Sequence, residues 1–89
     1  MESTENKTEN LSKEELLQNA LKAREQEVLY YQINIDNYEL ALQEIAKMPP
    51  SDQAALADFA AQLNNLLGTE RLEQKKAKVM LSVVKQQLE

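Results

Sequence analysis

The sequence of 89 residues contains no histidine, no cysteine and no tryptophan, and it has only one glycine and two prolines. Without histidine, no imidazole is available to transfer protons near neutral pH. Without cysteine, the chain has no thiol nucleophile, disulfide or thiolate metal ligand. A single glycine excludes a glycine-rich phosphate-binding loop. We therefore expect that the protein is not an enzyme, and the sequence offers no catalytic, cofactor-binding or metal-binding residues.

A long hydrophobic run is also missing. No apolar stretch approaches the roughly 18 residues that a membrane span requires. The first five residues do not form the basic and apolar start of a secretory signal. Hydrophobic residues nevertheless make up 43% of the chain, which is typical of a globular protein. We expect one small cytoplasmic domain that binds neither a membrane nor a small-molecule substrate.

The charge of the chain is negative and unevenly distributed. Fifteen acidic residues outnumber ten basic ones, which gives a formal net charge of −5. This balance opposes direct binding to nucleic acid, because such binding depends on neutralising phosphates. Residues 1–48 carry a net charge of −5, residues 49–68 carry −2 and residues 69–89 carry +2. The distribution suggests that an acidic first half lies beside a mildly basic last part.

The polar residues 1–11 are typical of a disordered tail, and residues 12–89 are expected to form a single helical domain. Ser12 and Glu15 have the spacing of a capping box, which predicts a helix start. No glycine or proline follows until Pro49 and Pro50, which cannot continue a helix. The first helix is therefore predicted over residues 12–47.

Apolar residues recur at alternating steps of three and four in both halves of the chain, which is the pattern of a coiled-coil seam. In the first half the seam positions are Glu14, Leu17, Leu21, Arg24, Val28, Tyr31, Ile35, Tyr38, Leu42 and Ile45. In the second half they are Leu56, Ala60, Leu63, Leu67, Glu70, Gln74, Ala77, Leu81, Val84 and Leu88.

Two helices of matched length joined by a short proline-containing link predict an all-α fold, a long antiparallel two-helix coiled-coil hairpin. The second helix is expected over residues 52–88, with Ser51 as its cap. Gly68 leaves two alternatives open, because glycine disfavours a helix interior. Either the second helix continues through Gly68, or it breaks there and the fold has three helices.

Polar residues interrupt both seams. Folding the chain at the prolines places Arg24 opposite Gln74, with Glu70 one turn away. A buried polar layer of this kind fixes the register of two helices more often than it adds stability. We therefore predict that Arg24 contacts Glu70 or Gln74, and that Arg24, Glu70 and Gln74 form a register-setting layer.

Each helix also carries apolar residues outside its seam, and a hairpin covers only one stripe per helix. The candidate partner-binding residues are Leu29, Ile33, Leu40, Leu72, Val79 and Val83. Three occupants remain open. The first is a second copy, which would form a homodimeric four-helix bundle, and the second is a different protein. The third is a further helix of the same chain, if Gly68 breaks the second one.

These features favour a non-catalytic helical protein–protein interaction module, an adaptor or assembly factor that acts by bundle packing. An assembly chaperone that shields the unpaired helices of a partner is one version. One alternative is an acidic inhibitor or nucleic-acid mimic that occupies a basic cleft on a nucleic-acid-handling protein. Another is a purely structural homo-oligomer.

Overall fold

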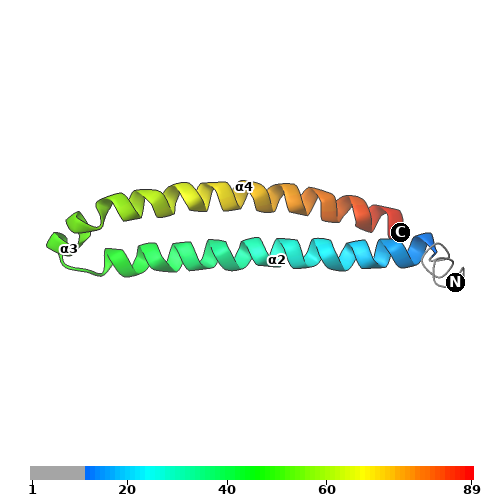
Figure 1. Ribbon diagram of the computed structural model, residues 1–89, viewed down its shortest axis with the longest axis horizontal. Coiled ribbons are helices and arrows are strands. Elements are labelled where there is room, and N and C mark those ends of the chain that lie inside the picture. The colour runs from blue at the N-terminus through cyan, green and yellow to red at the C-terminus, as the bar shows by residue number, and fades with distance from the viewer. Residues whose placement is uncertain (1–11) are drawn as a thin grey trace, which may run out of the picture.

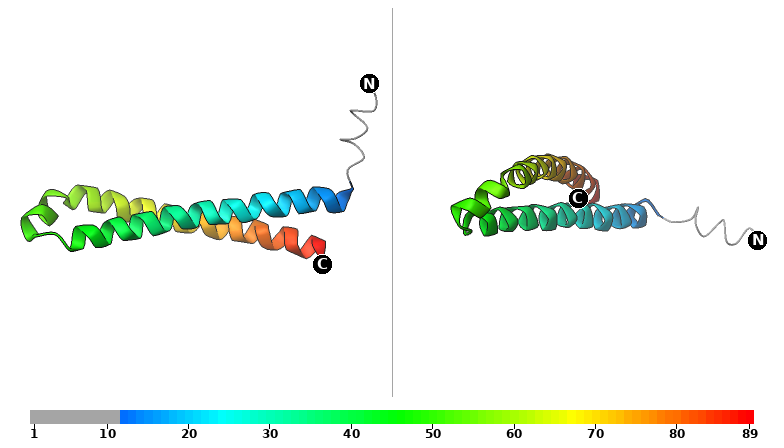
Figure 2. Two further views of the ribbon diagram at one scale, coloured as in Figure 1. Left: turned by 90° about the horizontal axis from the view of Figure 1, so that it is seen from below. Right: turned by 60° about the vertical axis from the view of Figure 1, so that its left-hand side comes forward.

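The computed structural model describes residues 12–89, so the expected tail over residues 1–11 lies outside the described part. Three helices follow one another: α2 (Lys13–Ala46), α3 (Pro50–Ala55) and α4 (Ala57–Leu88). The long helices α2 and α4 run antiparallel side by side, and α3 lies at the turn between them (Figure 1). From a second direction the two long helices cross (Figure 2). The predicted all-α helical hairpin is confirmed.

The start of α2 is fixed by the predicted capping box. The Ser12 hydroxyl accepts a hydrogen bond from the Glu15 amide at 3.0 Å, and the Ser12 amide donates to the Glu15 carboxylate at 3.0 Å. Glu14 and Glu15 also place negative charge at the positive end of the helix dipole. From this cap α2 runs for 34 residues, about 51 Å at 1.5 Å per residue.

The turn is built differently from the prediction, because the prolines start a short helix. Pro49 is the N-cap of α3 and Pro50 is its first residue, where a missing amide hydrogen costs nothing. Ser51, the predicted cap, therefore lies inside α3. The Gln53 side-chain amide donates to the carbonyl oxygens of Ala46 and Met48 at 3.2 and 2.8 Å. These bonds satisfy carbonyls that the end of α2 leaves without helical partners.

The second half of the chain is interrupted at Leu56 and not at Gly68. Leu56 has backbone angles of φ −101° and ψ 12° and separates α3 from α4. Its amide still donates to the carbonyl of Asp52, and its carbonyl still accepts from the amide of Ala60. Helical bonding thus continues on both sides of a local kink. α4 passes through Gly68 without a break, so the alternative with a third helix starting there is wrong.

The seam lies where the sequence predicted it. Every predicted seam residue is buried or half-buried except Glu14, which is exposed at the start of α2. The buried apolar core comes from both long helices and consists of Ile35, Ile45, Leu63, Leu67, Ala77 and Val84. No side chain is completely enclosed in the described residues. A single layer of two helices explains this, because it covers each core residue from one side only.

Candidate protein-binding surfaces

One candidate surface lies on the outside of α2. Leu29, Ile33 and Leu40, here called the α2 stripe, are between 51% and 59% exposed. Their positions are about half a helical turn away from seam residues such as Ile35, so they point away from α4. The seam residues of α2 pack against α4, and residues on the opposite side of α2 therefore face outward.

A second candidate surface lies on the outside of α4. Leu72, Val79 and Val83, here called the α4 stripe, are between 40% and 61% exposed. Because α2 and α4 pack through their seams, the two stripes lie on opposite sides of the hairpin. The structure therefore leaves all six predicted residues accessible but does not unite them in one patch. A single docking helix can cover only one of the two stripes.

The predicted polar layer does not assemble. Gln74 is buried, but its side-chain amide donates to the Val28 carbonyl at 3.2 Å and to the Gln32 side-chain oxygen at 2.8 Å. Arg24 instead pairs with Glu27, three residues along its own helix, at 3.2 Å. The expected pairing of Arg24 with Glu70 or Gln74 is therefore absent from the hydrogen bonds and ion pairs of residues 12–89.

The cause is a shift of register. The chain turns at α3 rather than at the two prolines, so each residue of α4 lies beside a residue further along α2 than expected. Gln74 is thus bonded one to two turns beyond Arg24. Glu70 accepts a hydrogen bond from the Asn34 side chain at 3.1 Å. The polar groups of the seam are satisfied by asparagine and glutamine, and not by the arginine.

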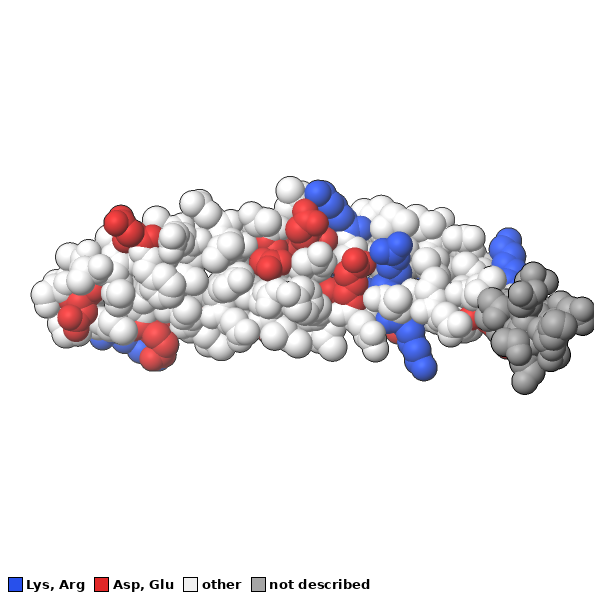
Figure 3. Space-filling view, viewed as in Figure 1, with Lys and Arg blue, Asp and Glu red and all other residues white. Residues whose placement is uncertain are grey.

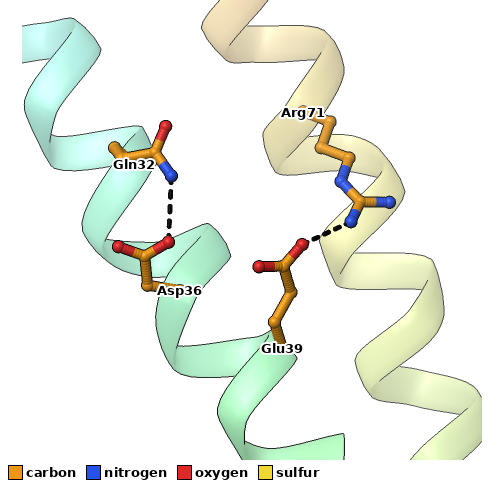
Figure 4. A network of polar contacts seen from close by, with 4 residues as sticks. All are labelled: Gln32, Asp36, Glu39 and Arg71. Carbon is orange, nitrogen blue, oxygen red and sulfur yellow. Dashed lines mark hydrogen bonds and ion pairs between the residues drawn. The ribbon is translucent and has the colours of Figure 1, made fainter.

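One edge of the seam is charged and polar. Arg71 of α4 donates to the Glu39 carboxylate of α2, and Gln32 donates to Asp36 within α2 at 2.9 Å (Figure 4). We call this side the charged edge. The Glu39–Arg71 pair is the one ion pair that joins the two long helices within residues 12–89. The expected complementarity between the acidic first half and the basic last part is thus represented by a single contact.

The opposite edge carries exposed apolar residues. Phe59, Leu66 and Met80 are all more than one third exposed and are here called the apolar edge. Phe59, Leu66 and Met80 each directly precede a seam residue of α4. None of these three residues is among the six candidate partner-binding residues predicted from the sequence. These residues belong to a row with seven-residue spacing at positions 59, 66, 73 and 80, in which only Glu73 is polar. This spacing is the sequence pattern that predicts an apolar row beside the seam.

A shallow depression crosses both helices near the Met80 end of the apolar edge. It is lined by Arg24, Glu27, Tyr31, Glu73, Lys76, Ala77 and Met80. Lys76 pairs with Glu73 at 2.9 Å, so the two cations and two carboxylates here are balanced. Glu27 and Met80 share this depression. The row of residues 27, 34 and 41 in α2 and the row of residues 59, 66, 73 and 80 in α4 therefore flank the seam on the same side.

Tyr31 is the titratable group that this surface perturbs. Its ring is half-buried and lies edge-to-face against Tyr30, with 5.6 Å between ring centroids. Partial burial, together with the nearby carboxylates of Glu73 and Glu27, raises the pKa of Tyr31 above its ordinary value of 10.0. Both influences disfavour the phenolate anion. Tyr31 therefore remains neutral at physiological pH and contributes apolar surface to the depression.

Charge is absent from one part of the surface. In Figure 3, charged side chains gather near the middle of the hairpin and around the turn, and the surface between them carries none. The sequence gives the reason, since residues 59–69 of α4 contain no Asp, Glu, Lys or Arg. Phe59 and Leu66 lie in this uncharged stretch.

The described part of the chain holds no cluster of three or more acidic residues arranged to bind a metal ion. None of its helices combines the length and apolar character needed to cross a membrane. Comparisons with models of protein families, with characterised proteins and with solved structures found no match.

Proposed function

We propose that the protein is a non-catalytic helical interaction module, an adaptor or assembly factor that binds other proteins by packing helices against its own. One observation carries the proposal. In residues 12–89, twelve large apolar side chains are exposed, whereas six apolar side chains are buried. Scattered apolar residues are ordinary on protein surfaces, but contiguous apolar patches mark interaction sites.

The spacing of the exposed residues supports helix packing as the binding mode. The α2 stripe has steps of four and seven residues, and the α4 stripe has steps of seven and four. Such spacing keeps side chains on one face of a helix and matches the anchor pattern of helix-in-groove recognition. Fully burying one such leucine or isoleucine side chain contributes about 1.5–3 kcal/mol. The two stripes face opposite directions, so each would bind its own partner element.

Affinity capture from the cells that make the protein tests this proposal. We expect partners held by the α2 stripe to be lost when Leu29, Ile33 and Leu40 are all replaced by glutamine. The exposed pair Gln26 and Gln43 on the same helix, both replaced by alanine, is the matched control and should retain those partners. Circular dichroism checks that both variants keep the helicity of the unchanged protein.

The proposal is contradicted if the glutamine variant keeps its helicity and captures the same proteins in the same amounts. The dependence on salt gives a second readout. Binding through the α2 stripe should persist when the ionic strength is raised, because apolar contacts are not screened. Capture that disappears at moderate salt in all variants would instead favour an acidic inhibitor of a basic cleft.

A further inference from the structure

The two edges of the seam differ in charge and in exposed apolar surface, and the proposed function does not involve this difference. Across the charged edge, Arg71 is paired with Glu39, so the two helices are already linked there. Along the apolar edge, Phe59, Leu66 and Met80 keep 41% to 47% of their surface exposed. These residues extend the seam of α4 on one side only. A helix with apolar residues at both seam positions and one flanking position is typical of a four-helix bundle.

The charges of the apolar edge permit a second copy of the same chain to pack there. The protein carries a net charge of −5, which opposes self-association over most surfaces. Near the Met80 end of this edge, however, Arg24 and Lys76 balance Glu27 and Glu73. Toward the turn, residues 59–69 contribute no charge at all. Two copies therefore meet here without the repulsion that their net charge would otherwise cause.

We propose that two copies pack through their apolar edges, with both α3 turns at the same end, and form a four-helix bundle. This inference rests on the proposed function and assigns self-contact to the apolar edge, so that the α2 and α4 stripes stay free for other proteins. With both turns at one end, the uncharged stretches of the two copies lie at the same level, and Phe59 and Leu66 of each copy lose their exposure against the other copy.

The level of the central charges favours the same orientation. Gln74 is bonded to the carbonyl of Val28, so Glu27 and Lys76 lie at nearly the same height along the hairpin. In a bundle with both turns at one end, α2 of each copy neighbours α4 of the other at that same height. Glu27 of one copy then faces Lys76 of the other, and opposite charges meet across the interface.

Two leucines of α4 provide the matched test. Leu66 of the apolar edge and Leu72 of the α4 stripe are 45% and 54% exposed, so both accept a charge equally well in a single chain. Light scattering after size exclusion should give twice the chain mass of 10.2 kDa for the unchanged protein and for Leu72→Glu. For Leu66→Glu we expect a single-chain mass, because a carboxylate buried in the interface weakens association about a hundredfold or more.

A label at the turn tests the orientation without relying on a destabilising variant. The chain has no cysteine, so Ser51→Cys, at an exposed position of α3, carries one spin label per copy. With both turns at one end, the two labels lie within about 25 Å of each other. With the turns at opposite ends, they lie about 50 Å apart, the length of a helix of this size.

Each outcome decides the inference. A single-chain mass for the unchanged protein at micromolar concentration overturns the bundle and leaves the capture of other proteins through the stripes intact. Dissociation by Leu72→Glu, alone or together with Leu66→Glu, overturns the assignment to the apolar edge. A long distance between the labels overturns the orientation. The expected masses together with a short distance support the bundle, even if no other protein is captured through the α2 stripe.

Discussion

The seam and the outer stripes are made of the same kinds of side chain, yet they differ tenfold in exposure. In α2, Ile35 is 5% exposed and Ile33, two residues earlier, is 51% exposed. In α4, Leu67 is 5% exposed and Leu72, five residues later, is 54% exposed. Residue type therefore does not distinguish the core from the candidate binding surface. Position relative to the seven-residue repeat does.

The largest difference in stability between seam and stripe variants is expected when matched leucines are truncated to alanine. Leu67→Ala removes buried methyl groups and leaves a gap, and it should lower the free energy of unfolding by about 2–4 kcal/mol. Leu72→Ala removes the same atoms from an exposed site and should change it by less than about 0.5 kcal/mol. Urea unfolding followed by circular dichroism measures both, at one chain concentration because self-association shifts apparent stability.

The α2 pair serves as an independent repeat, with Ile35→Ala expected to resemble Leu67→Ala and Ile33→Ala to resemble Leu72→Ala. Equal losses at buried and exposed sites would contradict the comparison. They would mean that the outer stripes are already covered in the purified protein, so that the stripes cannot be free binding surfaces.

The fold follows from the sequence because its signals agree with one another. The capping box at Ser12 and Glu15, the two prolines and the apolar repeat each predict the same hairpin, and the structure confirms it. The sequence leaves a break at Gly68 open, and the structure shows that α4 continues through it, with the repeat in the same phase on both sides of the glycine. One unfavourable residue of about 1 kcal/mol does not outweigh the packing of a helix along its whole length.

The sequence predicts the register of the two helices and the exposed surface less completely than it predicts the fold. The sequence predicts Arg24 opposite Gln74 if the chain turns at the prolines, whereas the extra turn of α3 brings Gln74 to Val28 and Gln32. Helix pairing shifts by several residues when the turn gains a short helix, and no pattern within the seams reveals this. Phe59 is absent from the sequence-based candidates for a different reason: it directly precedes the seam residue Ala60, and Glu73 interrupts the seven-residue row that it shares with Leu66 and Met80.

A smaller effect is expected at a helix position that packs against nothing. Apart from the adjacent residues and the backbone of its own helix turn, a Cβ atom added at Gly68 meets no atom within 4 Å, and the backbone there is helical with no positive φ. Gly68→Ala should therefore raise the free energy of unfolding by about 0.5–1 kcal/mol, because alanine loses less backbone freedom on folding. Thermal and urea unfolding both measure this gain.

Ala61 provides the matched control for Gly68. It lies seven residues earlier on the same face of α4 and is also exposed. Ala61→Gly should lower stability by a similar amount, since only the backbone term changes at either position. If Gly68→Ala destabilises the protein, the face around Gly68 is covered by something absent from the single hairpin, and the comparison between buried seam and exposed surface fails there.

The smallest effect is confined to alkaline solution and tests the boundary between the seam and the apolar edge. Partial burial and the carboxylates of Glu73 and Glu27 raise the pKa of Tyr31 above 10.0 in the folded protein. A neutral acid with a raised pKa stabilises the folded state fully below its unfolded pKa, and this contribution is lost as the pH rises from 10.0 toward the folded pKa.

Tyr31→Phe should therefore lose less stability than the unchanged protein over that range. Urea unfolding at neutral and alkaline pH measures this difference, and the measurements at neutral pH are the control for the lost hydroxyl group. Parallel dependences of stability on pH for the two proteins would show that Tyr31 lies in water rather than between the helices.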